Sequence, residues 1–351
     1  MYKLFAIQTF IYTKHNDERN ERIKIMKKLY FIPGSQDLYG EECLKQVAAD
    51  CNKMVKFFNK KLGDTISFEL LPTVETSDIC VEDMKKVMCD DECVGVVTWM
   101  HTFSPAKMWI KGLQMLRKPL LHLHTQANEK LPYDEIDMDF MNLNQAAHGD
   151  REYGYILARL NIPHQVVAGY YEHKDVLDEI RQFAQVAKAI DLSKHMRVAT
   201  FGNNMRDVAV TDGNRLESEI KYGWEIKYWG IGEIVDLVDK VTAKELNAKM
   251  AEYKKKYTMA TDNIDAVKEQ AKYEIAFEKF MSQNRCYAFT DNFQDLHGMK
   301  QLPGMAAQDL MAEGIGFGPE GDYKIAAFSA VLMKMAEGRK GATGFIEDYT
   351  Y

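Results

Sequence analysis

The sequence predicts an α/β fold in which a doubly wound parallel sheet is followed by a second strand-led α/β domain. Apolar strand-like runs alternate with amphipathic helical stretches, and this order favours parallel strands joined by right-handed crossovers. The 351 residues are enough for two domains and the start of a third. Hydrophobic residues make up 46 % and charged residues 28 %, which is typical of a globular enzyme with large cores.

The first domain is predicted from residue 26 to residue 196. Short apolar runs bounded by turn residues indicate its strands, and longer runs with helical periodicity indicate its helices. The predicted strands are 29–32, 66–71, 94–100, 119–124 and 165–169. The predicted helices are 41–62, 77–89, 105–116 and 174–190.

Polar segments follow several of these strands, at 34–39, 101–104 and 124–126. In doubly wound sheets, binding sites gather beyond the carboxyl ends of the strands, so these segments are expected to form one site rim. The stretch 133–151 is too acidic for a buried strand and too apolar for a linker. Helical spacing would place Gln145 and His148 on one face, three residues apart.

The second domain is predicted over residues 197–340 and begins with a strand at 197–201. Helices are expected at 231–241, 243–257 and 265–281, then a strand at 286–290 and a turn-rich segment at 293–298. Alternating charge along these helices indicates a solvated face rather than a binding surface.

Two carboxylates near the end of the sequence, Glu320 and Glu347, are candidates for a shared site. A helix of fourteen residues rises about 21 Å, and an extended strand covers that distance in about six residues. A helix at 322–336 followed by an extended 341–347 would therefore return Glu347 to Glu320. Two adjacent carboxylates share a proton or a divalent cation, whereas spacing alone also fits two surface glutamates at loop edges.

The helix between them is expected to begin at Asp322 and to end near Gly338. Its helical spacing predicts one apolar face, formed by Ile325, Phe328, Leu332 and Met335.

Several classes of protein are disfavoured. The net charge of −7 argues against a nucleic-acid surface, and no apolar run approaches the roughly 18 residues of a membrane span. The six cysteines form no CxxC pair and are expected to be free thiols in a reducing cytosol. The GxGxxG, P-loop, GxSxG and HExxH motifs are absent, so nucleotide, serine-hydrolase and zinc-protease chemistry lack their signatures.

Residues 1–25 are expected to precede the natural start at Met26.

The chain resembles the L-arabinose isomerase family over residues 26–351. The motifs that carry the resemblance are long and run from the first strand to the last residues. They are GSQDLYG (34–40), WMHTFSPAKMW (99–109), HTQ (124–126), IDMDFMNLNQAAHG (136–149), NMRDVAVTDG (204–213), DLHGMKQLPG (295–304), EGD (320–322) and FIEDYTY (345–351).

The resemblance implies a Rossmann-like N-terminal domain, a central α/β domain and a third domain, of which 341–351 would be a stub with the rest missing. It implies a cytoplasmic enzyme of L-arabinose catabolism that interconverts L-arabinose and L-ribulose, with D-galactose as a side substrate. The cofactor would be a divalent metal, usually Mn²⁺. Glu320 and Glu347 match the catalytic, metal-binding glutamates. The substrate-contacting positions match Gln36, Leu38, Tyr39, Gln145, His148, Met205 and Phe293.

In the family, the residues matching Gln145 and His148 reach the site of a neighbouring subunit in a hexamer. Two metal-binding histidines of the family lie beyond the point where this sequence ends, and none of its nine histidines matches them by motif. We therefore expect weak Mn²⁺ binding and little turnover from this chain alone. Two alternatives stay open: an isomerase for another sugar such as L-fucose, and a non-catalytic sugar-binding or subunit-interaction remnant.

Overall fold

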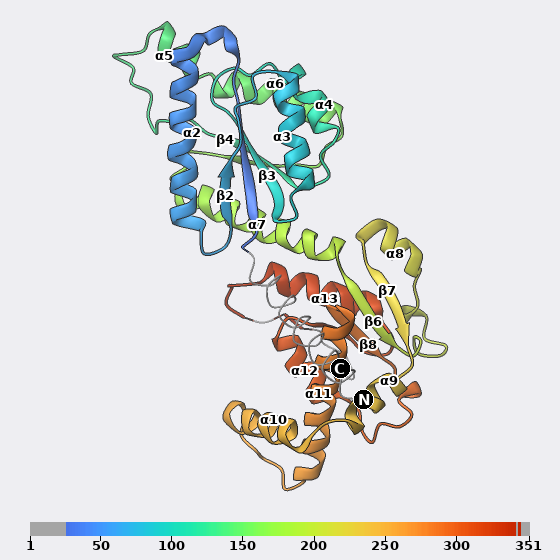
Figure 1. Cartoon of the computed structure of the whole chain (residues 1–351). Coiled ribbons are helices and arrows are strands. Elements are labelled where there is room, and N and C mark those ends of the chain that lie inside the picture. Colours follow the sequence, from blue (N-terminus) through green and yellow to red (C-terminus); the bar gives the residue numbers. More distant parts are fainter. Residues whose placement is uncertain (1–25, 342, 345–351) are drawn as a thin grey trace, which may run out of the picture. The chain divides into compact units, whose positions relative to one another are not determined.

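The computed structural model describes residues 26–341 and 343–344, and it contains two compact units (Figure 1). The first unit ends at Lys188 and the second begins at Ala189, so the division falls within helix α7 (Lys174–Lys194). The predicted domain boundary at 196/197 coincides with the start of strand β6 (Arg197–Phe201). Each unit is a parallel sheet covered by helices.

The sheet of the first unit has the strand order β2-β1-β3-β4-β5, and every pair is parallel. The strands are β1 (Lys28–Gly34), β2 (Ser67–Leu70), β3 (Cys93–Met100), β4 (Leu120–His124) and β5 (Gln165–Ala168). β3 is buried along its whole length, as expected for a central strand covered on both faces. The doubly wound sheet is therefore confirmed, with each strand within three residues of its predicted bounds.

Helices cover both faces of this sheet (Figure 1). α2 (Gly40–Leu62) and α7 share one core with side chains such as Phe31 and Trp99. α3 (Ser77–Cys89) and α6 (Ala146–Arg159) share the other core with side chains such as Tyr30. The two cores alternate along β1 because successive side chains of a strand point to opposite faces.

Two helical predictions differ from the structure in the first unit. The segment predicted as helix 105–116 begins as the 3₁₀ helix η2 (Ala106–Trp109) and continues as the short α4 (Ile110–Leu113). The segment before α6 is broken, because α5 (Met138–Leu143) ends before Gln145. Gln145 is the N-cap of α6 with non-helical dihedral angles, so it precedes the helix that carries His148.

The sheet of the second unit has the order β7-β6-β8-β9, again all parallel. Its strands β6 (Arg197–Phe201) and β8 (Ala288–Asp291) were predicted, whereas β7 (Glu225–Trp229) and β9 (Gly316–Gly318) were not. α8 (Arg215–Tyr222) and α12 (Gly304–Ala312) were not predicted either. β9 has only three residues, two of them glycine, and so lacks a β-branched signal.

Helices α9 (Gly232–Asp239), α11 (Ile264–Asn284) and α12 pack on one face of this sheet, and α13 (Tyr323–Met335) packs on the other. Asp322 caps α13, since its carboxylate accepts the amides of Lys324 and Ile325. That start agrees with the prediction, but the predicted apolar face is wrong. Ile325 and Phe328 are 40 % and 50 % exposed, and α13 instead buries Tyr323 and the alanines 326, 327 and 330.

The prediction of a solvated face along the charged helices is wrong at one place. Lys249 of α10 (Ala243–Lys256) is buried, with its ammonium 2.8 Å from a carboxylate oxygen of Glu274 of α11. Glu278 lies at the same distance from this ammonium and Glu252 at 3.2 Å. Charge alternation in sequence does not distinguish a solvated pair from one enclosed between two helices.

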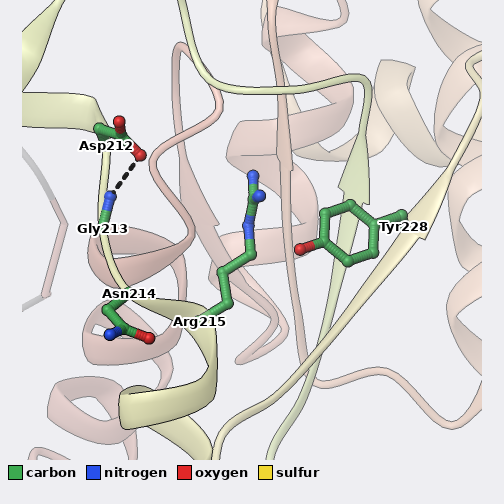
Figure 2. A pocket seen from close by; sticks show the side chains of 5 residues that line it. All are labelled: Asp212, Gly213, Asn214, Arg215 and Tyr228. Atoms are coloured by element: carbon green, nitrogen blue, oxygen red, sulfur yellow. Dashed lines mark hydrogen bonds between the residues drawn. The ribbon is translucent and has the colours of Figure 1, made fainter.

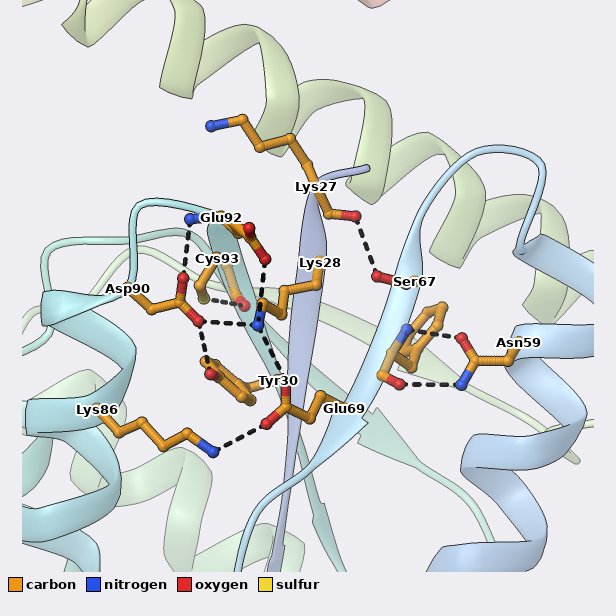
Figure 3. Close-up of polar contacts among 12 residues, drawn as sticks. Lys27, Lys28, Tyr30, Asn59, Ser67, Glu69, Lys86, Asp90, Glu92 and Cys93 are labelled. Carbon is orange, nitrogen blue, oxygen red and sulfur yellow. Dashed lines mark hydrogen bonds and ion pairs between the residues drawn. The ribbon is translucent and has the colours of Figure 1, made fainter. Parts of the chain in front are cut away.

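A polar network joins the start of β1 to the edge strand β2 and to the turn before β3 (Figure 3). The Lys28 ammonium lies 3.0 Å from carboxylate oxygens of both Glu69 and Asp90. The Tyr30 hydroxyl donates to Asp90 at 2.6 Å, and Lys86 donates to Glu69 at 2.8 Å. This network lies at the end of the sheet opposite the predicted site rim.

All six cysteines are free, as predicted. Within the described ranges, no helix combines the length and the apolar character that crossing a membrane requires.

Candidate active site

The carboxyl ends of β1 and β3 form a rim in the first unit. The Ser35 and Thr102 hydroxyls, which directly follow these strands, are 2.8 Å apart and buried. Gly34 makes this approach possible, because a Cβ atom there would lie 2.7 Å from the Ser104 hydroxyl oxygen. The two segments are thus fixed to each other by close backbone packing and a buried hydrogen bond.

Three predicted sugar-contacting residues lie at this rim, directly after Ser35. Gln36 is the N-cap of the 3₁₀ helix η1 (Asp37–Tyr39), which contains Leu38 and Tyr39. Leu38 is 79 % exposed, whereas Gln36 and Tyr39 are half-buried.

The start of α6 lies against the same rim. Gly149 packs so closely on the segment after β3 that a Cβ atom there would lie 3.0 Å from the Thr102 carbonyl oxygen. The Phe103 ring stacks on the His148 imidazole, with ring centroids 4.4 Å apart. Gln145 donates to the Asn142 side chain at 3.2 Å. The five predicted positions of this unit therefore belong to two segments, 36–39 and 145–148, and each segment adjoins or makes a contact with the segment after β3.

Phe103 was not among the predicted site residues. It lies in the polar segment that follows β3, which the sequence did identify as part of a rim. Its contact with His148 is set by the packing of α6, which no local sequence pattern reveals.

The second unit brings together its own three predicted residues. The Met205 amide donates to the Glu320 carbonyl oxygen at 2.9 Å, which joins the loop after β6 to the turn after β9. The Arg206 amide donates at 2.8 Å to the side chain of Gln294, which follows Phe293 in η4 (Phe293–Asp295). The segments that carry Met205, Phe293 and Glu320 thus meet at the carboxyl edge of this sheet, where binding sites of doubly wound folds gather.

The backbone around Glu320 is held in an unusual conformation. Glu320 has φ of +63°, in the left-handed region that non-glycine residues rarely adopt. Gly321 follows with φ of +80°, and its amide donates to the Asp291 carbonyl oxygen at 2.8 Å. Among the described residues, no side chain or amide bonds to the Glu320 carboxylate, so this group is available to a ligand.

Asp291 is a second carboxylate at this edge, and the sequence analysis did not single it out. It ends β8, is buried, and one carboxylate oxygen has no hydrogen-bond partner among the described residues. Burial raises the pKa of Asp291 to about 7. A carboxylate desolvated in this way is stabilised by a nearby cation, so the oxygen-rich edge fits a hard divalent ion.

An open surface pocket lies beside this edge and is lined by Asp212, Gly213, Asn214, Arg215 and Tyr228 (Figure 2). The Arg215 guanidinium lies over the Tyr228 ring, 4.6 Å from its centroid, and 5.5 Å from that of Tyr323. It also donates to the Asn203 side chain at 2.6 Å. Because the Asn203 carbonyl accepts from Asn292 at 3.2 Å, the pocket is coupled to the loop that carries Met205.

The second predicted glutamate, Glu347, lies outside the described residues, and its meeting with Glu320 stays a prediction. His297 is exposed just after η4. His122 is buried on β4, and His124 at the end of that strand is about one-third exposed.

Comparisons with known proteins cover nearly the whole chain. Residues 24–195 match the model of the L-arabinose isomerase N-terminal domain, and residues 197–338 match that of the L-arabinose isomerase central domain. A protein named L-arabinose isomerase 2 from Bacillus licheniformis is 49 % identical over 331 residues, 93 % of this chain and 69 % of the relative. L-arabinose isomerases from Halalkalibacterium halodurans and Thermotoga maritima are 48 % and 46 % identical, each over 92 % of this chain and 66 % of the relative. The chain spans about two thirds of the length of these relatives.

Proposed function

The chain belongs to the L-arabinose isomerase family, and from this membership we propose that it acts in the metal-dependent conversion of L-arabinose to L-ribulose. The reaction is an intramolecular oxidation and reduction, in which an aldose becomes a ketose through an ene-diol. The observation that carries the proposal is the clustering of Met205, Phe293 and Glu320 at one sheet edge, with a Glu320 carboxylate that bonds to no described neighbour.

We propose that Glu320 and Glu347 hold a divalent cation, with Mn²⁺ as the physiological ion. Carboxylate oxygens suit this hard ion, and the buried unpaired oxygen of Asp291 adds another oxygen atom to this edge. When bound, the cation would supply electrostatic stabilisation for the negative charge that develops on the sugar oxygens. The residues of this chain would bind the sugar, orient it and move its proton.

A carboxylate of the pair would transfer the proton between C2 and C1 of the sugar. General base catalysis requires a carboxylate within hydrogen-bond reach of that proton. The hydrogen bond from the Met205 amide to the Glu320 carbonyl oxygen fixes the backbone of Glu320 and so favours a defined position of its carboxylate. Gln36 and Tyr39 would orient the sugar hydroxyls through their amide and phenol groups. Leu38, Met205 and Phe293 would contact its carbon skeleton.

We propose that Gln145 and His148 reach the site of a neighbouring subunit, in a hexamer. The stacking of Phe103 on His148 supports this role, because it holds an exposed imidazole in one orientation. D-galactose, which shares the reacting carbons, is the proposed second substrate. The proposed location is the cytoplasm, consistent with six free thiols.

The test is ketose formation from L-arabinose by the purified protein, with and without Mn²⁺. Glu320→Gln and Glu347→Gln remove one charge each with little change in shape, and we expect each to abolish metal-dependent turnover. Glu233→Gln changes an exposed glutamate of α9 and serves as the control with unchanged turnover. Turnover that persists in Glu320→Gln would contradict the assigned role.

Two further outcomes distinguish the alternatives. Turnover of L-fucose in preference to L-arabinose would identify another sugar isomerase. Saturable sugar binding in the absence of metal, with no turnover under any condition, would identify a non-catalytic sugar-binding protein.

A further inference from the structure

A second group of metal-ligating side chains lies in the first unit and shares no residue with the carboxylate site. His122 and His124 come from β4, and Asp150 comes from α6. The His122 Nε2 atom is 2.9 Å from one carboxylate oxygen of Asp150, and the His124 Nδ1 atom is 4.0 Å from the other. One ligand atom from each of the three residues lies within 4.8 Å of the others.

Local structure explains why these residues meet. His122 and His124 are two residues apart on a strand, so both side chains point to the same face of the sheet. α6 covers that face, since its Tyr153 ring lies 4.6 Å from the His122 ring. Asp150 lies one turn before Tyr153 and therefore reaches the same two histidines.

The charge balance of this group is unusual for a buried carboxylate. Asp150 is almost fully buried, and its only ion-pair partners among the described residues are the two imidazoles. A second cluster of carboxylates, formed by Glu252, Glu274 and Glu313, differs in this respect, because the ammonium of Lys249 lies 2.8 Å from Glu274.

The orientation of His122 is that of a ligand with a supporting partner. Its Nδ1 atom is hydrogen-bonded to the Thr98 hydroxyl at 2.9 Å, which leaves Nε2 directed at Asp150. Metal-binding histidines commonly use their second ring nitrogen in this way, which fixes the ring and its tautomer.

The distances also suit a small cation. Ligand atoms about 2.0–2.1 Å from a tetrahedral ion lie roughly 3.3 Å from one another. The observed 2.9 Å and 4.0 Å separations lie on either side of this value. The remaining adjustment falls on His124, which is 35 % exposed and whose ring contacts that of His122 at a centroid distance of 4.7 Å. Its exposure also provides a route for the ion.

We propose that His122, His124 and Asp150 bind a late first-row divalent cation such as Zn²⁺. Two imidazoles and one carboxylate favour this class over Mg²⁺ or Ca²⁺, which prefer all-oxygen sites. The bound ion joins β4 to α6. Because α6 also carries His148, the ion stabilises the helix that presents this residue at the rim.

The experiment uses the Glu320→Gln/Glu347→Gln protein, in which the carboxylate site is disabled. Isothermal titration with Zn²⁺ should show one saturable equivalent per chain. His124→Ala should weaken this binding by about 100-fold or more, because loss of a supporting partner of a ligand alone costs about 10–100-fold. His173→Ala removes an exposed histidine paired with Glu129 at 3.1 Å and should leave binding unchanged.

Two further measurements separate this site from loss of fold and from binding at surface histidines. Co²⁺ should give visible d–d absorption that His124→Ala abolishes while circular dichroism stays unchanged. Zn²⁺ should slow hydrogen exchange in residues 120–124 and 146–159, and not in residues 243–256. Equal Zn²⁺ affinity in His124→Ala, binding lost in His173→Ala, or no saturable uptake would each overturn the proposal.

Discussion

The Met205 amide donates a 2.9 Å hydrogen bond to the carbonyl oxygen of Glu320, so the backbone of one proposed sugar-contacting residue holds the backbone of the proposed metal ligand. The Gly321 amide, bonded to the Asp291 carbonyl at 2.8 Å, holds the next peptide. Both bonds use main-chain atoms and do not involve the Glu320 carboxylate. The conformation of the turn after β9 is therefore set by main-chain hydrogen bonds and dihedral angles. Substitutions in this turn test how much that conformation contributes to stability.

Gly321→Ala should strongly destabilise the second unit. The new Cβ atom would overlap the Asn204 Cα atom, at a φ of +80° that disfavours any side chain. We expect the free energy of unfolding to fall by about 2–4 kcal/mol, the range for severe backbone conflicts. Denaturant-dependent hydrogen exchange of the β6 and β8 peptides measures this change.

Gly314→Ala is the matched control, because Gly314 has φ of +90° and no other atom lies within 4 Å of the place its new Cβ atom would occupy. It isolates the conformational cost, about 1–2 kcal/mol. Equal losses in the two variants would show that contact with Asn204 is unimportant.

Glu320→Gly should abolish Mn²⁺ binding without lowering stability. Glycine removes the strain of a left-handed φ of +63°, and this gain offsets the greater freedom of glycine in the unfolded chain. We expect the free energy of unfolding to stay within about 1 kcal/mol of the parent or to rise. Metal titration of this variant checks the loss of Mn²⁺ binding, and denaturant unfolding checks its stability. A loss well above this range would mean that the Glu320 side chain contributes to folding.

Phe103→Leu should impair sugar binding while the fold persists. The variant removes the stack on His148, with its 4.4 Å centroid separation, but keeps an apolar side chain. An aromatic pair contributes about 0.5–1.5 kcal/mol, so the KM for L-arabinose should rise about 2–10-fold. Tyr170→Leu breaks a ring contact with His173, 5.4 Å apart, beyond the edge strand β5 and not in the segments after β1 and β3, and should leave KM unchanged. Parallel rises in both variants would indicate a general loss of stability.

The strand and helix order of the first unit was predictable because its signals are local. β3 is an unbroken apolar run, and α3 begins where Thr76 caps it, within the predicted bounds. In the second unit, β9 is too short and too rich in glycine to be recognised, and its neighbours decide its conformation. The exposed Ile325 and Phe328 show the limit of periodicity, since α13 packs closely through alanines instead of its larger side chains.

The site residues were identified by motif resemblance, and their placement at strand ends followed from the fold class. Contacts between distant segments could not be predicted in that way. The stack of Phe103 on His148 and the burial of Asp291 both depend on tertiary packing. The same reason explains why the group on β4 and α6 was not foreseen, as Asp150 is 26 to 28 residues from its two histidines in sequence.

Acid should destabilise the first unit through Asp90 (Figure 3). Burial alone would raise the pKa of Asp90, but hydrogen bonds from Tyr30, the Glu92 amide and Lys28 outweigh it and lower the pKa from 3.8 to about 2. A lowered pKa stabilises the fold above the unfolded value and loses this contribution as the pH falls toward 2. The loss amounts to about 2 kcal/mol between pH 5 and pH 2.

Asp90→Asn should flatten this part of the pH dependence of unfolding, measured by hydrogen exchange of the β1 and β3 peptides. Asp134→Asn, at an exposed loop position, should keep the full acid response. An unchanged pH profile in Asp90→Asn would assign the acid sensitivity to other carboxylates.

Lys249→Met should be among the most destabilising changes on α10. It leaves the buried carboxylate of Glu274 without the ammonium that lies 2.8 Å away, and breaking a buried pair from one side costs about 3–5 kcal/mol. Lys249→Met/Glu274→Gln removes the unpaired charge and should recover much of this loss. Lys254→Met, on the exposed side of the same helix, should change stability by less than about 0.5 kcal/mol. Denaturant unfolding measures the coupling energy between Lys249 and Glu274. It compares the parent, the single variants Lys249→Met and Glu274→Gln, and the double variant. A coupling energy near zero would show that Glu278 and Glu252 hold Lys249 without Glu274.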